Sequence, residues 1–524
     1  MSSPRLLVLG VDAASPELIR RWTAAGAMPN LARLIERGRF GECRSVDGFF
    51  VGSTWPSLYT GTTPARHGLH YLRQLEVGSY EFYRPADRGM VRVPPFWDAL
   101  SAADRRVAIM DVPLAPIASD VNGLQLVEWG GHDVVYGLHA TPPEALALAE
   151  RQGPYPLEGP CDRVERTLAG YRRFLDALLL AVERKTALTV EVLERGGWDL
   201  VMQVFTEAHC AGHQCWHLHD ATHPAHDPEL AAALGDPLER VYGAIDKAIG
   251  ELVARAPDAV VMVLAGHGMG HWHGAHFLLR DLLIGLGFAT AEAAGRPEAE
   301  RGALGAAAAR AWRALPEGVR VALGPLRRRV AAPAAPAPPT LGVDPRSSRC
   351  LPQPNGLAVS GVRLNLRGRE PAGLVEPGEQ AEATLIALER ELGRVIDERT
   401  GRPAIRAIWR PGSRYRGDAL DQLPDLLLEW SDEIATGTTA LAGGRGARVR
   451  LASPALGVVE GVNDYGRTGE HRPTGWVAAA GPGIDPGPLG PASVIDVAPT
   501  IARLLGVELA GVDGRPIEAL APIG

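Results

Sequence analysis

The chain has 524 residues, 46% hydrophobic and 22% charged, which is the composition of a globular protein with a large core. Its formal net charge is −7, and its one basic run, residues 327–329, is interpreted as a solvated surface. A mildly acidic chain without a concentrated basic face is not expected to bind nucleic-acid duplexes.

Targeting and redox features point to a cytoplasmic protein. No stretch reaches the roughly 18–20 apolar residues needed to span a bilayer, and we expect no membrane partner. The first apolar run, residues 6–11, is too short for a signal peptide. The five cysteines show no framework spacing, which favours free thiols in a reducing compartment.

Apolar and amphipathic segments alternate along the chain. Short apolar runs without alternation predict strands buried on both faces at residues 6–11, 107–110, 200–205, 260–264, 426–428 and 475–480. Amphipathic patterns predict helices at residues 15–25, 28–37, 171–195, 238–255 and 379–399. This order predicts an α/β fold in which helical layers enclose a central, mostly parallel sheet.

One segment, residues 285–345, departs from this alternation. It is rich in Ala, Arg and Pro, and residues 331–339 read AAPAAPAPP. We expect helices followed by an extended Pro-rich linker, inserted beside the functional face as a candidate lid. The flanking parts, 1–284 and 346–524, are then expected to form one domain together.

Two segments near the start of the chain carry candidate groups. Asp12 follows the first strand, at the carboxyl end of the sheet, where α/β proteins bind ligands. Ser53 and Thr54 follow Gly52 and precede Pro56, as at a helix N-terminus, where free N–H groups favour anions. Each also has a simpler interpretation, as a turn residue or a helix cap. A hydroxyl becomes a nucleophile only where something lowers its pKa, as a metal does.

Histidines form the second group of candidates. His209 and His213 are four residues apart, so a helix places both imidazoles on one face, as metal ligation requires; an isolated pair of this kind is more often only a polar face. His267 lies in a Gly-rich turn after a predicted strand, and His471 precedes the last one. Other histidines crowd the same segments at 271, 273 and 276, and those at 217, 219, 223 and 226 are expected mostly at the surface.

In this order the motifs resemble the alkaline phosphatase superfamily, and within it the type I phosphodiesterase/nucleotide pyrophosphatase branch. The resemblance runs from Val8-Leu9-Gly10-Val11-Asp12 to residues 496–506 and leaves out 285–345. It implies an alkaline-phosphatase-like catalytic domain. It also implies that Thr54, followed by an aromatic residue and Pro56, is the nucleophile. The sulfatase pattern Cys/Ser-x-Pro-x-Arg is not met, because Pro56 is followed by Ser57 and Leu58.

The resemblance further implies two metal sites. Matching positions of the first are His209, His213 and His471; those of the second are Asp12, Thr54, Gly266 and His267. The family has aspartate at positions 209 and 266. The histidine at 209 therefore removes a negative charge, and the glycine at 266 removes a ligand. Two neighbouring divalent cations need anionic ligands. Candidates to compensate are Glu207 first, then His271 or His273, and more distantly Asp47 and Asp246.

These features imply a metal-dependent hydrolase of phosphate esters, of the phosphodiester or nucleotide pyrophosphate type. Thr54 would attack the phosphorus of a small-molecule phosphoester substrate and become a phospho-threonine intermediate. Three imidazoles suit Zn²⁺, as one or two ions, with Mn²⁺ as the second choice. Two rivals stay open: a phosphoryl or sulfuryl transferase or mutase of the same fold, and a non-catalytic member with an incomplete metal site. Oligomeric state has no signal in the sequence.

Overall fold

A ten-stranded sheet forms the centre of the computed structural model, which describes residues 4–131, 134–157, 164–292, 341–433, 448–463 and 465–520. Nine strands follow one another across the sheet, and β21 (Ala492–Ser493) pairs with β2 beside them. Their order is β20 (Gly487–Pro488), β2 (Arg39–Arg44), β19 (Thr474–Ala480), β9 (Val260–Ala265), β1 (Leu6–Val11), β8 (Leu200–Phe205), β5 (Val107–Met110), β6 (Gly123–Val127) and β7 (His139–Thr141).

The middle of this sheet is parallel. Strand β1 pairs in parallel with β8 on one side and β9 on the other, so Val8 lies between Met202 and Met262. Strands β5 and β6 continue the parallel run, whereas β19 and β7 are antiparallel to their neighbours. All residues of β1, β5 and β8 are buried, as expected of apolar runs without alternation.

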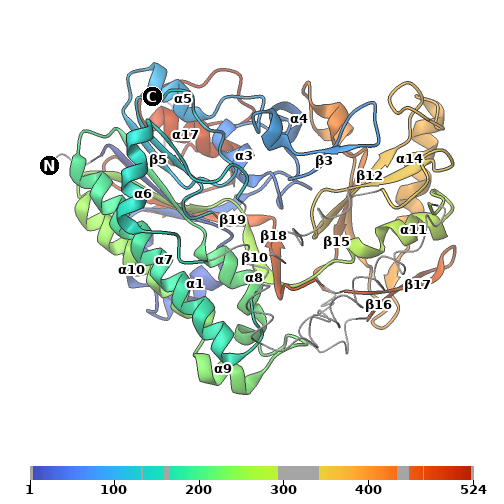
Figure 1. The fold of residues 1–524 in the computed structure, drawn as a ribbon, viewed down its shortest axis with the longest axis horizontal. Coiled ribbons are helices and arrows are strands. Elements are labelled where there is room, and N and C mark those ends of the chain that lie inside the picture. The colour runs from blue at the N-terminus through green and yellow to red at the C-terminus, as the bar shows by residue number, and fades with distance from the viewer. Residues whose placement is uncertain are drawn as a thin grey trace, which may run out of the picture.

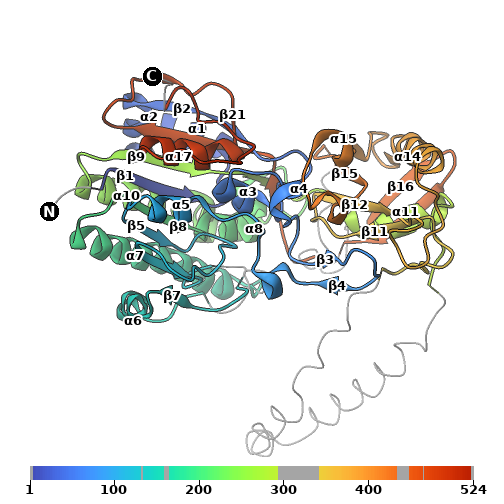
Figure 2. The ribbon, with the colours of Figure 1, turned by 90° about the horizontal axis from the view of Figure 1, so that it is seen from above.

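Helices cover both faces of the sheet (Figures 1 and 2). Alternate residues of β1 face opposite layers: Leu7 and Leu9 belong to one hydrophobic core, Leu6 and Val8 to another. The first layer contains α1 (Pro16–Ala24), α2 (Pro29–Arg37), α6 (Leu146–Gln152), α7 (Leu168–Arg195), α8 (Glu207–His219), α9 (Pro228–Leu234) and α10 (Pro237–Arg255). The second contains α3 (Thr54–Thr60), α4 (Pro64–His67), α5 (Phe96–Ala102) and α17 (Val497–Leu504). The predicted α/β architecture is confirmed.

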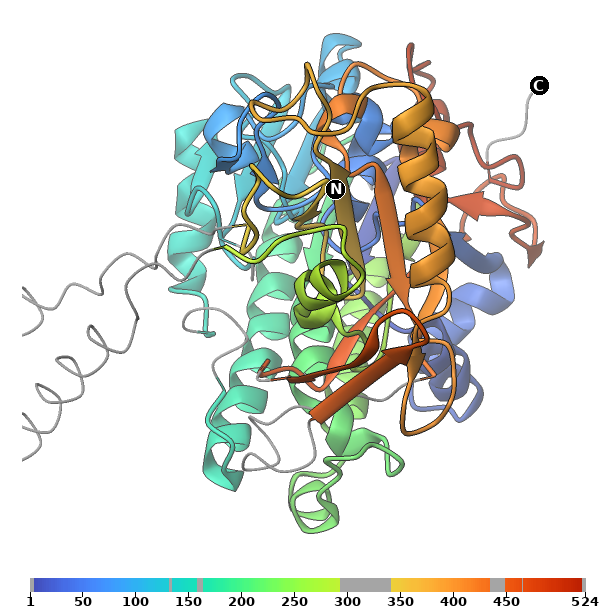
Figure 3. The same cartoon turned by 90° about the vertical axis from the view of Figure 1, so that its right-hand side faces the viewer.

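A second, antiparallel sheet with its own core lies beside the central one, and Figure 3 views the molecule from that side. Its order is β11 (Cys350–Gln353), β12 (Val359–Leu364), β15 (Leu426–Trp430) and β14 (Ile405–Trp409). Around it are α11 (Leu279–Gly285), α14 (Glu379–Leu392), α15 (Pro411–Arg414), and the three-stranded sheet of β13 (Ile396–Asp397), β16 (Arg448–Ser453) and β17 (Gly457–Val462). The predicted strand at 426–428 is therefore real but belongs to this sheet.

Most predicted elements are confirmed within a few residues, with one error. The helix expected over 379–399 ends at Leu392, because residues 396–397 form β13 and pair with β16 instead. The Pro-rich part of the expected insertion and the basic run at 327–329 lie outside the described residues. Four described cysteines, at 43, 210, 215 and 350, are buried. None of the described helices combines the length and apolar character that crossing a bilayer requires.

Candidate functional site

The parallel strands bring three predicted residues to one edge of the sheet. Asp12 follows β1, Glu207 follows β8 at the start of α8, and His267 follows β9. Since β8, β1 and β9 are neighbours, their carboxyl ends open on the same side. The backbone N–H of Asp12 donates to the carbonyl of Phe205 at 2.9 Å, which ties the first two ends together.

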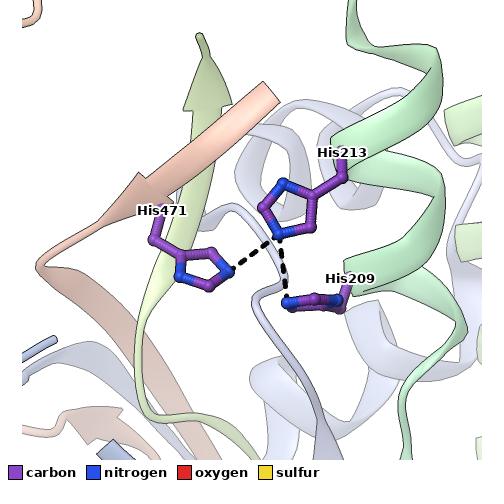
Figure 4. Close-up of side chains that lie close together, drawn as sticks. All are labelled: His209, His213 and His471. Carbon is purple, nitrogen blue, oxygen red and sulfur yellow. Dashed lines mark hydrogen bonds between the residues drawn. The ribbon is translucent and has the colours of Figure 1, made fainter. Parts of the chain in front are cut away.

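The clearest feature at this edge is a cluster of three buried histidines (Figure 4). His209 and His213 lie one turn apart on α8, and His471 comes from β18 (Gly469–Arg472), which pairs with β10 (Gly268–His271). The Nε2 atom of His213 lies 3.1 Å from the Nε2 atoms of both His209 and His471. Among the described residues, these three form the set whose ligand atoms all lie within 4.8 Å of one another.

The protonation of His213 fits a metal ligand. Its Nδ1 lies 2.8 Å from the carbonyl oxygen of Gly469, which only accepts hydrogen bonds. Nδ1 must therefore carry the proton, and the lone pair of Nε2 faces the other two imidazoles. A backbone carbonyl that fixes the tautomer in this way is the usual support of a metal-binding histidine. Three converging imidazoles suit a divalent zinc-like ion.

Asp12 and His267 lie next to this cluster. The ring centroids of His267 and His471 are 4.6 Å apart, edge to face. Nδ1 of His267 is 4.0 Å from Oδ1 of Asp12. The same carboxylate oxygen accepts a hydrogen bond from the indole N–H of Trp55 at 2.7 Å. No sequence pattern predicts this role of Trp55, because it requires α3 and the end of β1 to meet.

Thr54 is the first residue of α3 and is buried. Its hydroxyl donates to the carbonyl of Phe50 at 3.1 Å and lies 2.7 Å from the hydroxyl of Ser45. The predicted position at a helix start is confirmed.

A cavity of about 230 Å³ brings the predicted residues together. Thr54, Asp12, His209, His267 and His471 all line it. Its other lining residues are Val51, Gly52, Trp55, Tyr71, Leu72, Pro113, Leu114, Leu357, Tyr465 and Arg467. Thus Tyr71 also reaches the cavity, and burial lowers the pKa of the adjacent His70 to about 3.

The residues considered as compensating ligands have other contacts. Oε1 of Glu207 accepts from the hydroxyl of Tyr155 at 2.8 Å and lies 3.2 Å from Nζ of the buried Lys185. His271 contacts the carbonyl oxygen of Asp432 through Nε2 at 2.7 Å and lines a different pocket. Neither Glu207 nor His271 lines the cavity.

His273 and the two more distant candidates also contact other groups. His273 contacts Arg472, and burial together with that guanidinium lowers its pKa well below the ordinary value. Asp47 pairs with Arg414 at 2.8 Å, and Asp246 accepts from the backbone N–H groups at the start of α2.

Two expectations for the neighbouring histidines need correction. His217 and His223 are buried rather than exposed, and burial lowers the pKa of His217 to about 3. For His217 the reason is the position of α8, which contacts α7, α10, β10 and β18. A helix enclosed on all sides has no solvent face, whatever its polarity.

Comparison with known proteins gives one family. Residues 6–308 match the family model for type I phosphodiesterase / nucleotide pyrophosphatase. No curated protein matches the chain significantly. Among solved structures, phosphonoacetate hydrolase from Sinorhizobium meliloti 1021 is similar, with 94% of each chain covered. Its complex with phosphonoformate has 14% identity and a TM-score of 0.47, and its complex with phosphonoacetate has 16% and 0.46.

Proposed function

The chain belongs to the type I phosphodiesterase/nucleotide pyrophosphatase family and is a hydrolytic enzyme of the alkaline phosphatase superfamily; from this premise we propose that it cleaves phosphodiesters or nucleotide-like pyrophosphates with Thr54 as nucleophile. We also propose that His209, His213 and His471 hold a zinc ion. The observation that carries the proposal is the shared cavity, which the buried Thr54 lines together with His209 and His471, two members of the histidine cluster.

The proposed reaction has two steps, of which Thr54 carries the first and water the second. The Oγ1 atom of Thr54 forms a bond to phosphorus as the bond to the leaving oxygen breaks, giving a phospho-threonine and the first product. Water then attacks phosphorus and displaces Oγ1, so that one water is consumed and the threonine hydroxyl is restored. A metal ion, when bound, supplies Lewis-acid stabilisation of the phosphoryl oxygens.

The surroundings of Thr54 support this role by fixing its starting position. Its hydroxyl proton is directed at the carbonyl of Phe50, and Ser45 holds the same oxygen from a second side. Asp12 is held by the indole of Trp55 and lines the same cavity. A pre-positioned nucleophile loses little freedom on reaching the transition state, which is where such sites gain rate.

Thr54→Val tests the nucleophile, because valine keeps the shape of threonine and removes only the hydroxyl. We expect turnover of bis(4-nitrophenyl) phosphate, followed as 4-nitrophenolate release, to fall on the order of a thousandfold or more. Thr54→Ser, which keeps a hydroxyl, should retain most of the activity. Wild-type turnover of diester, monoester and pyrophosphate substrates by the valine variant would rule out this role.

A further inference from the structure

A second pocket, formed in part by the antiparallel sheet, lies beside the cavity that Thr54 lines. It has a volume of about 290 Å³, and Tyr71 and Leu357 line both spaces. Leu357 belongs to the turn between β11 and β12, which packs tightly against the cavity wall. A Cβ atom built on Gly356 in this turn would lie 2.8 Å from Cβ of Val51, another residue that lines the cavity. The two spaces are therefore neighbours with shared walls.

The size of the first cavity limits what it holds. Its volume of about 230 Å³ is below the roughly 300–1,000 Å³ of pockets that enclose drug-sized ligands. An ester group as large as a nucleoside therefore extends beyond this cavity. The second pocket offers further space next to Tyr71 and Leu357.

Two buried amide side chains, Gln353 and Asn355, line the second pocket; they are 2% and 1% exposed. The NH₂ group of Asn355 donates to the carbonyl of Gly48 at 2.8 Å. That of Gln353 donates to the carbonyl of Gln422 at 2.8 Å and lies 3.5 Å from Nε2 of His70. Since a carbonyl oxygen only accepts hydrogen bonds, these contacts fix which end of each amide is the oxygen.

Both amide oxygens are thereby left as buried acceptors. Neither Oδ1 of Asn355 nor Oε1 of Gln353 has a hydrogen-bond partner within the described part of the chain. An acceptor buried without a donor costs stability, and a ligand that brings N–H groups recovers that cost on binding. The pocket walls also include aromatic and aliphatic side chains, among them Phe82 and Leu279, which favour an aromatic ring over a polyol.

We propose that the second pocket binds an ester group of the substrate, and that this group is an aromatic ring bearing an amino substituent. The proposal rests on the proposed function, because it names a substrate group of the same site. An amino group offers two N–H donors, as many as there are unpartnered amide oxygens. A site built to accept such bonds disfavours a ring without the donors, because its buried oxygens then stay unpaired.

Binding of two nucleoside monophosphates tests the class of ligand. Adenosine 5′-monophosphate carries the amino group, and purine riboside 5′-monophosphate differs only in lacking it, so contacts to ribose and phosphate cancel. Calorimetry on the wild-type protein should show about tenfold or more tighter binding of adenosine 5′-monophosphate. Equal affinity for the two nucleotides would overturn the proposal, and this comparison needs no variant.

Variants of the two amides test the position. Gln353→Met and Asn355→Leu keep a similar volume and remove the acceptor, so each should lower the affinity ratio of the two nucleotides severalfold. Inorganic phosphate, which has no ring, should bind both variants as it binds the wild type. Gln125→Met is the matched control, because it removes a buried amide of the central sheet that lines neither space. The full ratio in both pocket variants, or an equal loss of the ratio in the control, would overturn the assignment to this pocket.

The affinity ratio is measured without turnover, so the two proposals can fail separately. Amino-dependent binding in a chain that cleaves no phosphoester would refute the proposed function and leave the pocket assignment standing. An active chain that binds both nucleotides equally would do the reverse.

Discussion

Replacing His213 by alanine removes the histidine that contacts both other members of the cluster. Its Nε2 atom lies 3.1 Å from the Nε2 atoms of His209 and His471, so the variant keeps only two of the three imidazoles. Alanine is the most favourable residue inside a helix, so α8 itself should persist. We expect zinc binding to collapse while the chain stays folded.

The size of the effect follows from ligand linkage. Losing a residue that only supports a ligand weakens metal binding about 10–100-fold, so losing one of three ligands should cost at least a hundredfold. With zinc at a hundred times the wild-type Kd, binding stabilises the wild type by about 2.7 kcal/mol and the variant by about 0.4 kcal/mol. Separately, the lost bond to Gly469 costs the metal-free protein about 1 kcal/mol.

The assay is the shift in thermal midpoint on adding zinc, backed by competition with a chromophoric chelator. Because the comparison is made within each variant, the metal-independent cost cancels. His217→Ala is the matched control: it removes a buried histidine from the same helix, one turn further on and outside the cluster. It should keep the full zinc-dependent shift.

A zinc-dependent shift in His213→Ala equal to that of the wild type would refute the argument from geometry. So would a loss of the shift in His217→Ala of the same size, because the effect would then report damage to α8 rather than to a metal site.

Two further predictions concern buried ionisable groups. Burial lowers the pKa of His67 to about 3, against 6.5 in the unfolded chain. The unfolded state therefore binds the extra proton first as the pH falls. The free energy of unfolding decreases as pH falls from about 6.5 towards 3, by up to about 1.4 kcal/mol per pH unit. His67→Gln should flatten that slope in urea unfolding series, and an unchanged slope would contradict the assignment. Lys185→Met leaves the carboxylate of Glu207 buried without its cation, at a cost of about 3–5 kcal/mol. Adding Glu207→Gln should restore at least about 1 kcal/mol, and strict additivity of the two changes would show that the pair is not coupled.

Local patterns predicted the elements that carry the site. The apolar runs gave strands β1, β8 and β9, and the strand–helix order placed their carboxyl ends together. The four-residue spacing of His209 and His213 put both on one face of α8. These predictions succeed because a strand or helix imposes its period on neighbouring residues, whatever the rest of the chain does.

The second sheet and the enclosure of α8 were not predicted. The segments of the second sheet carry the same short apolar runs as the central one, so periodicity alone does not assign Leu426–Trp430 to either. Similarly, nothing local distinguishes the buried His217 from an exposed histidine. Burial depends on which elements pack around α8, and that is a property of distant segments.

The sequence by itself determined an α/β chain with a threonine at a helix start, a histidine pair on one helix face and a likeness to one enzyme family. The family likeness also grouped His471 with His209 and His213, and the tertiary structure brings His471, 258 residues after His213, to within 3.1 Å of it. Only the tertiary structure decided that Trp55 holds Asp12, and that Glu207 contacts Lys185 rather than the cavity. The physical reason is that spacing fixes neighbours within one element, whereas a site is made where several elements pack together, and that packing depends on the whole core.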